Sequence, residues 1–322
     1  SGSSVVINGA AGSLIEFNNN SAGFGSAIYN TRNFNITADT IKFVGNTTLD
    51  SGSTSPSGNH DGTIYNSGTM AIDTNSAIFV GNTATRGGAI YNTGTLSLNN
   101  GYFKGNSALD GGAVQNYNGN IVISNSIFEG NTATAGYGGA LYNQNGNVTL
   151  INTSFYDNKA HSSSAIVNYG TLNIIADDGI SEFKGNLRSN GNIYRAISNG
   201  SSTLSTVVNL NAGNNGRIAF YDAIHNAATI NINKTGIKLA DGSTDAPTDG
   251  EIYIANTIQN LDGTDSTINL YNGTLTLAKE EYLSDGTQNL NLNGGVLNLI
   301  NNEIGTVVVN DFSSSADAKL NI

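Results

Sequence analysis

The strongest constraint on this chain is a segment that repeats along it. Residues 79–92 read FVGNTATRGGAIYN, residues 103–116 read FKGNSALDGGAVQN, and residues 128–143 read FEGNTATAGYGGALYN. Less similar copies begin at Phe17 and Phe155. A sequence that repeats at this scale stacks one structural unit on itself. The repeat therefore predicts a solenoid rather than a set of separate globular domains.

One unit, residues 95–116, divides into three short strands. Residues 95–99 (TLSLN) alternate apolar and polar side chains, which is the period of a strand. Residues 101–106 and 111–116 form the next two expected strands, and each ends at an asparagine. Glycine and asparagine tolerate a positive φ best, so their recurrence at these ends indicates corners.

The spacing of the repeats supports this division. The aliphatic residue of the third strand recurs at intervals of 24, 27 and 25 positions, at Ile90, Val114, Leu141 and Ile166. Three short strands with their turns fill such a period, whereas helical repeats are longer. We therefore predict an all-β fold: a right-handed parallel β-helix with about three short strands and roughly 24–27 residues per coil.

We expect residues 1–322 to form a single β-helix. Residues 1–190 hold the regular coils, and residues 191–322 continue the solenoid with less regular ones. The interval from Ile28 to Ile64 is 36 positions, which predicts a loop insertion at residues 48–61. A second loop is expected at residues 241–250. The opening and closing residues indicate a fragment cut from a longer chain.

Composition excludes several classes of partner and site. The formal net charge is −11, which argues against nucleic acid and anionic membranes as partners. The absence of cysteine excludes disulfides and thiolate zinc sites. Only 11% of residues are charged, so about fifty asparagines and 40 glycines dominate the polar surface and the turns. No apolar run approaches the length of a membrane helix.

Two rows of repeated residues suggest structural roles. The asparagine that ends each unit could line a ligand site, but we favour a corner ladder in which each amide bonds the next coil, formed by Asn30, Asn66, Asn92, Asn116, Asn143 and Asn168. The phenylalanine that begins each unit predicts a stacked core, formed by Phe17, Phe43, Phe79, Phe103, Phe128, Phe155 and Phe183.

The tyrosines are the candidate ligand-binding residues. Tyr29, Tyr65, Tyr91 and Tyr142 each follow an inward aliphatic residue, so alternation sends them outward. Neighbouring coils would then expose a strip of rings able to stack on sugars or on another protein. The alternative is that outward tyrosines simply favour the sheet and shield its backbone.

An enzymatic role needs clustered carboxylates or a metal site, because parallel β-helices also house polysaccharide lyases and hydrolases. The carboxylate pairs here lie beside glycines or other charges, as in solvated turns, and the three histidines are scattered. The motifs H-E-x-x-H and G-x-S-x-G and the RTX-type calcium nonapeptide do not occur. We expect no catalytic residue, no metal site and no cofactor.

Two paired motifs carry a family resemblance. G-G-A followed by an aliphatic residue stands at residues 87–90, 111–114 and 138–141, and F-x-x-N begins at each of the seven phenylalanines. This density resembles the repeats of the polymorphic outer-membrane protein family, which are autotransporter passengers. The resemblance covers roughly the first 190 residues. It implies a β-helix that is secreted or displayed on the outer membrane of a Gram-negative bacterium, attached only through a C-terminal barrel outside this chain.

The functional expectation is adhesion without catalysis. A rigid rod would make weak, repeated contacts along one strand face to a protein or glycan on a host cell or a neighbouring bacterium. The alternative is self-association, in which another copy of the chain is the partner and bacteria aggregate. A lyase or hydrolase on the same fold is the third hypothesis.

Overall fold

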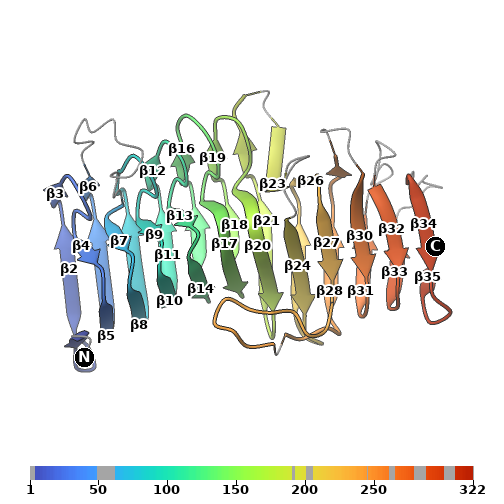
Figure 1. Ribbon diagram of the computed structural model, residues 1–322, viewed down its shortest axis with the longest axis horizontal. Coiled ribbons are helices and arrows are strands. Elements are labelled where there is room, and N and C mark those ends of the chain that lie inside the picture. The colour runs from blue at the N-terminus through green and yellow to red at the C-terminus, as the bar shows by residue number, and fades with distance from the viewer. Residues whose placement is uncertain are drawn as a thin grey trace.

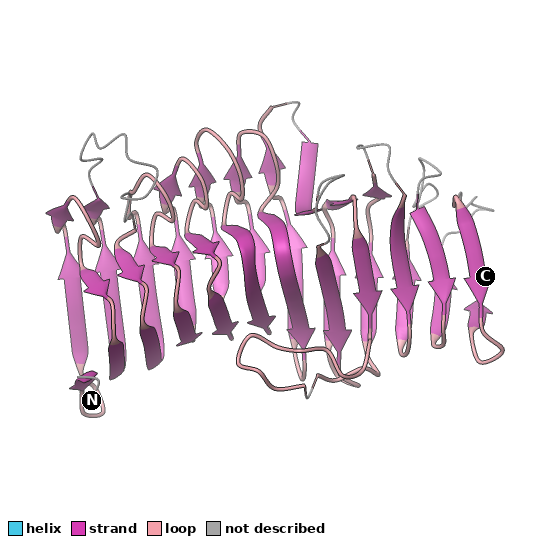
Figure 2. Cartoon of the chain, in the orientation of Figure 1, coloured by secondary structure: helices cyan, strands magenta, loops and turns pink. Residues whose placement is uncertain are grey.

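A computed structural model describes residues 4–48, 62–190, 193–200, 206–244, 246–260, 265–278, 288–300 and 309–321. Every regular element in these ranges is a β-strand (Figure 2). The coils lie side by side along the longest axis, from the N-terminal coil to the C-terminal one (Figure 1). The prediction of an all-β parallel β-helix is confirmed.

Three rows of strands form three walls of the rod. The first wall consists of β1 (Ser4–Asn8), the first halves of β5 (Asn33–Val44) and β8 (Thr69–Val80), β10 (Thr95–Asn99), β14 (Asn120–Ser124), the second halves of β17 (Leu141–Ile151) and β20 (Ile166–Ala176), β24 (Val207–Ala212), β27 (Thr229–Ile232), β30 (Ser266–Leu270), β32 (Gln288–Leu292) and β34 (Asp311–Ser314). The second wall consists of β2 (Leu14–Asn18), the second halves of β5 and β8, β11 (Gly101–Lys104), β15 (Ile127–Glu129), β18 (Ser154–Tyr156), β21 (Ile180–Lys184), β25 (Arg217–Phe220), β28 (Glu251–Ile254), β31 (Thr274–Leu277), β33 (Val296–Leu299) and β35 (Lys319–Asn321).

The third wall is shorter and is flanked by a separate set of two-residue strands. It contains β4 (Ile28–Asn30), β7 (Ile64–Asn66), β9 (Ile90–Asn92), β13 (Val114–Tyr117), the first halves of β17 and β20, β23 (Ile193–Asn199), β26 (Ala223–Asn226) and β29 (Ile258–Gln259). The outer strands are β3 (Ser21–Ala22), β6 (Thr47–Thr48), β12 (Ser107–Ala108), β16 (Thr132–Ala133), β19 (Lys159–Ala160) and β22 (Leu187–Arg188).

Each strand pairs with its counterpart one coil away. Apart from the antiparallel pairing of β22 with β23, the pairings of the described strands are parallel. The register aligns equivalent repeat positions, as in Ile28 with Ile64 and Ile64 with Ile90. The 36-residue interval therefore occupies one coil. Thr48 ends β6, and the rest of the loop predicted at residues 48–61 lies outside the described residues.

The phenylalanines of F-x-x-N form one column inside the second wall. Neighbouring ring centroids are 4.4–5.0 Å apart, and the ring planes lie within 6° of each other from Phe17 to Phe183. Phe220 extends the column at 4.7 Å and 18°. Ile254 and Leu277 then occupy the same inward row in the next coils. All seven phenylalanines beyond Phe17 are fully buried, which makes this column the centre of the apolar core.

The asparagines that end the third wall form a buried amide ladder. Each side-chain Nδ2 donates to the Oδ1 of the next asparagine at 2.7–3.0 Å, from Asn30 to Asn168. The ladder continues to Asn199 and Asn226. The same amides also donate to backbone carbonyls at the corner, as Asn92 does to Gly94 at 3.0 Å. Buried corner groups thereby gain the partners that burial requires.

A second buried ladder runs through the asparagines of F-x-x-N. It comprises Asn20, Asn46, Asn82, Asn106, Asn131, Asn158 and Asn186. Each amide from Asn46 onward also donates to the carbonyl of a phenylalanine in the preceding coil, for example Asn106 to Phe79 at 2.9 Å. The Oδ1 of an asparagine in this ladder also accepts the backbone N–H of the asparagine one coil earlier, as Asn106 does from Asn82. These side chains therefore join successive coils at a second corner.

Asp222 ends the second ladder. Its carboxylate accepts the backbone N–H groups of Gly185 at 3.0 Å and Asn186 at 2.8 Å, and the Asn186 amide at 2.8 Å. Burial raises the pKa of Asp222 above its ordinary value, although these hydrogen bonds oppose the rise. A carboxylate thus occupies a buried position where the preceding coils use a neutral amide.

The two glycines of G-G-A serve different needs. The first adopts a positive φ, at 57° in Gly87 and 60° in Gly111. The second lies against the backbone of the next coil. A Cβ on Gly112 would meet the carbonyl carbon of Thr132 in β16 at 2.6 Å and would overlap the carbonyl oxygen of Gly139. The motif therefore permits a turn and a close backbone approach in consecutive residues.

We predict that Gly112→Ala destabilises the rod more than Gly105→Ala does. Gly105 has a φ of 60° but open space beside its Cβ position, so alanine there adds only backbone strain of about 1 kcal/mol. Alanine at position 112 also collides with backbone atoms that cannot rotate away. The midpoint of urea unfolding should fall at least about twice as far for Gly112→Ala. Equal losses would contradict the close approach.

We predict that Asp222→Asn stabilises the protein at neutral pH but not at low pH. Since the folded-state pKa of Asp222 is raised, its contribution to stability is fully present below the unfolded pKa of about 3.9 and is lost as the pH rises through the folded value. Asparagine carries no charge and escapes this loss. Thermal unfolding of both proteins at about pH 3.5 and pH 7.5 measures the difference. A stability difference independent of pH would refute the burial of this charge.

Candidate functional site

The predicted tyrosine strip is directed as expected but is largely covered. The rings of Tyr29 and Tyr65 stack with centroids 4.8 Å apart, and Tyr65 and Tyr91 follow at 6.0 Å. Tyr29 is 51% exposed, but the exposed fractions of Tyr65, Tyr91 and Tyr142 are 5%, 4% and 7%. The expectation of an exposed strip is therefore wrong for three of the four tyrosines.

Residues that precede the third-wall strands pack against Tyr91 and Tyr142. The guanidinium of Arg86 lies 5.0 Å from the centroid of Tyr91. The ring of Tyr137 lies 5.6 Å from that of Tyr142, and Tyr169 closes a cluster of three rings at 5.9 Å from Tyr142. Burial raises the pKa of Tyr142, so its hydroxyl stays neutral. Alternation determines on which side of a wall a ring lies, but not what packs beyond it.

A loop also covers part of the first wall. After β27 the chain runs back beneath earlier coils (Figure 1), and we call residues 234–244 and 246–249 the strap. The backbone N–H of Ala240 donates to Thr149 Oγ1 of β17 at 2.9 Å, across 91 residues of sequence. Ile237 and Leu239 pack on the outward side chain of Ile175. The loop expected at residues 241–250 is thus part of a longer segment that starts before it.

The outer side of the second wall is not covered in this way and concentrates charge. We call the outward residues of β2, β5, β8, β11, β15, β18, β21, β25 and β28 the charged face. The four glutamates of the described ranges all belong to it: Glu16, Glu129, Glu182 and Glu251. Four basic residues accompany them: Lys42, Lys104, Lys184 and Arg217. The named acidic and basic residues of this face are equal in number, although the whole chain has a net charge of −11.

Contacts between neighbouring coils order these side chains. Lys42 binds Glu16 at 3.2 Å, Lys104 binds Glu129 at 3.0 Å, and Arg217 binds Glu251 at 2.7 Å. These pairs are partly exposed, so each contributes little to stability. Their effect is to fix the positions of the charges along the rod.

Tyrosines take part in the same face. The hydroxyl of Tyr102 donates to Glu129 at 2.5 Å, and that of Tyr156 donates to Glu182 at 2.8 Å. Hydrogen bonds from Tyr102 and then Lys104 hold the pKa of Glu129 below its usual value. Lys184 lies 5.5 Å from the centroid of Tyr221. Rings, cations and carboxylates therefore alternate on one exposed surface.

Apolar side chains complete the charged face. Leu14, Ile127 and Ile180 are 52%, 42% and 58% exposed. Sequence reasoning did not single out these residues or the tyrosines among them. The available signal was the alternation around each F-x-x-N phenylalanine, because residues one or three positions away from it point outward when the phenylalanine points inward.

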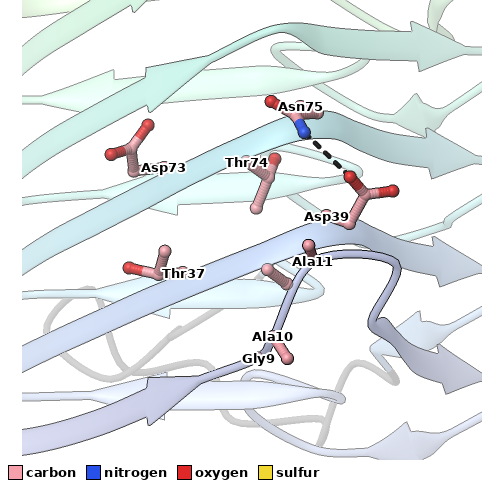
Figure 3. Close-up of a pocket in the computed structure, with 9 residues that line it drawn as sticks. Gly9, Ala10, Ala11, Thr37, Asp39, Asp73, Thr74 and Asn75 are labelled. Carbon is pink, nitrogen blue, oxygen red and sulfur yellow. Dashed lines mark hydrogen bonds between the residues drawn. The ribbon is translucent and has the colours of Figure 1, made fainter.

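A depression of about 270 Å³ lies at the corner between the first and second walls near the N-terminal end (Figure 3). It contains the carboxylates of Asp39 and Asp73, and Asn75 Nδ2 donates to Asp39 at 2.8 Å. Thr74 Oγ1 is buried beside them without a hydrogen-bond partner. Within the described ranges, no three His, Asp or Glu side chains are grouped so that they could hold a metal ion.

Comparison with known proteins identifies the repeat. The family model described as the Chlamydia polymorphic membrane protein repeat matches residues 14–31, 76–93 and 125–144. Each match runs from a second-wall strand through the following third-wall strand, and so includes an F-x-x-N phenylalanine and asparagines of both ladders. Neither the curated proteins nor the solved structures give a match. No helix in the described part of the chain could span a membrane. The chain carries repeats of the polymorphic membrane protein type, as its F-x-x-N and G-G-A pairs predict.

Proposed function

We propose that this chain is the β-helical passenger segment of a Gram-negative autotransporter, displayed on the cell surface or secreted, and that it acts as a non-enzymatic adhesin. The three repeat matches support a location at the bacterial surface. Adhesion would be directed to proteins or glycans of a host cell or of a neighbouring bacterium. The charged face is the contact surface in this proposal.

The observation that carries the proposal is the make-up of the charged face. It combines tyrosines, an arginine and exposed aliphatic residues on adjacent strands, and aromatic residues and arginine dominate the binding energy of protein interfaces. Tyr102, Tyr156 and Tyr221 lie in or directly after β11, β18 and β25, so contacts recur along the rod. Repetition gives weak contacts a combined strength that none has alone.

The other walls support the proposal less well. On the third wall, Tyr65, Tyr91 and Tyr142 are buried, and Arg86 and Tyr137 pack against the last two. The strap covers the first wall around Thr149 and Ile175. An adhesive contact on either surface would first have to displace a packed segment.

We predict that the variant Tyr102→Ala/Tyr156→Ala/Tyr221→Ala loses adhesion at least about tenfold, because large rings supply most contact energy. The measurement is binding of beads coated with the 322-residue chain to cultured epithelial cells and to bacteria. The matched control replaces three exposed tyrosines elsewhere, Tyr29, Tyr117 and Tyr137. The control should bind within about twofold of the unaltered chain. Loss in the control alone would move the adhesive surface to the third wall.

A further inference from the structure

The charges of the charged face follow a pattern that is complementary to itself. In the row immediately before each F-x-x-N phenylalanine, successive coils present Glu16, Lys42, Ile78, Tyr102 and Ile127. In the row immediately after it, successive coils present Val44, Val80, Lys104, Glu129 and Tyr156. Ser154 continues the first row on β18, and Glu182 and Lys184 then stand in the two rows on β21.

Reversing this pattern about the midpoint between β11 and β15 matches two pairs of opposite charges, whereas Glu16 and Lys184 face the uncharged Ala219 and Val44. A two-fold axis there, parallel to the strands, turns one rod antiparallel to the other and keeps each row facing its own kind. Lys104 of one copy then faces Glu129 of its partner, and the reverse holds at the symmetric position. Lys42 and Glu182 lie five coils apart within one chain, and Lys42 of one copy faces Glu182 of the other in the same way. One interface of this kind uses each charge pair twice.

Apolar residues meet in the same arrangement. Tyr102 faces the 42% exposed Ile127 of the second copy, and Val80 faces Tyr156. Parallel pairing of two rods would instead set Lys104 against Tyr102 and Lys42 against Val44 of the same coil, and would match only Glu182 with Lys184. The antiparallel register matches two kinds of charge pair instead of one and adds the apolar contacts.

We propose that the charged face binds a second copy of this chain in an antiparallel, two-fold symmetric pair centred between β11 and β15. The inference rests on the proposed role of this face as a contact surface and names the partner. The side chains in the Lys42–Glu16 and Lys104–Glu129 pairs are 34–50% exposed, so each can form a further contact with a second copy. At the axis, the Lys104–Glu129 pair of each copy closes a ring of four alternating charges with the pair of the other copy.

The size of the face sets the strength of the pair. Eight coils spaced about 4.8 Å apart, with strands about 15 Å long, give on the order of 600 Å² per partner. This is below the ~800 Å² per partner of a standard stable interface. The pair is therefore a weak, reversible dimer in solution and gains strength where many rods are displayed on opposing surfaces.

Charge exchange tests the pairing. One variant, Lys42→Glu/Lys104→Glu, makes its face acidic, and the other, Glu129→Lys/Glu182→Lys, makes it basic. Sedimentation of the unaltered 322-residue chain up to about 1 mM should show a dimer that weakens with salt. Each variant alone should lose association at least about tenfold, and an equimolar mixture should recover it to within about threefold, because every charge contact is opposite again. Lys159→Glu, on β19 away from this face, is the control.

Cross-linking tests the register. The chain has no cysteine, so Lys42→Cys/Glu182→Cys introduces the only thiols. Within one chain these positions lie five coils, about 24 Å, apart, beyond the reach of a disulfide. Oxidation should give a covalent dimer only in the double variant, and neither single variant should cross-link. The pairing would be overturned if the unaltered chain were strictly monomeric. It would also be overturned if mixing the two charge variants did not restore association and the double cysteine variant formed no cross-link. Cell adhesion by such a monomer would leave the proposed function standing.

Discussion

The fold depends on satisfying backbone groups at corners that are closed to water. A coil that turns three times within about 25 residues leaves peptide groups pointing into the interior at each turn, and every such group needs a partner. Asparagine provides a donor and an acceptor from one short side chain. The Nδ2 of Asn92 donates to the corner carbonyl of Gly94 and to Oδ1 of Asn116 in the next coil, and its Oδ1 accepts from Nδ2 of Asn66 in the preceding coil. The ladders are therefore both the solution to the corner and the link between coils.

This requirement determines where the chain can vary. An asparagine reaches its counterpart only if the next coil returns in register, so insertions must enter and leave between ladder positions. The 36-residue interval from Ile28 to Ile64 obeys this rule, since Asn30 and Asn66 still bond at 2.7 Å. The strap obeys it too, because it leaves after β27 and the chain resumes pairing at β28. The residues of the strap lie outside the coil and cover part of the first wall.

The sequence was sufficient to predict the structure of the repeated coil. It was not sufficient to predict which segments pack against the outside of the coils. Spacing alone predicted the coil, the phenylalanine column and the corner positions of the Asn30 row, because these depend on contacts between equivalent residues. The second ladder was not predicted, although Asn82 and Asn106 are the asparagines of two F-x-x-N motifs. An asparagine that follows a glycine is typical of a turn, and this pattern alone does not indicate a bond to the next coil. The burial of Tyr91 and Tyr142 involves Arg86 and Tyr137, whose positions before the third-wall strands no period encodes.

The same division supports our proposal that the outward residues of the second wall form the contact surface. Inward positions there are occupied by a phenylalanine column whose rings leave room for nothing else, and the flanking glycines and asparagines are required by the turn. The outward neighbours carry no such requirement, and they differ from coil to coil: Glu16, Lys42, Ile78, Tyr102 and Ile127 share one row. A row that is free to vary yet held at a fixed spacing by the ladders can present a specific pattern of charge. In the function that we propose, the rod supplies the spacing and the variable row supplies the recognition.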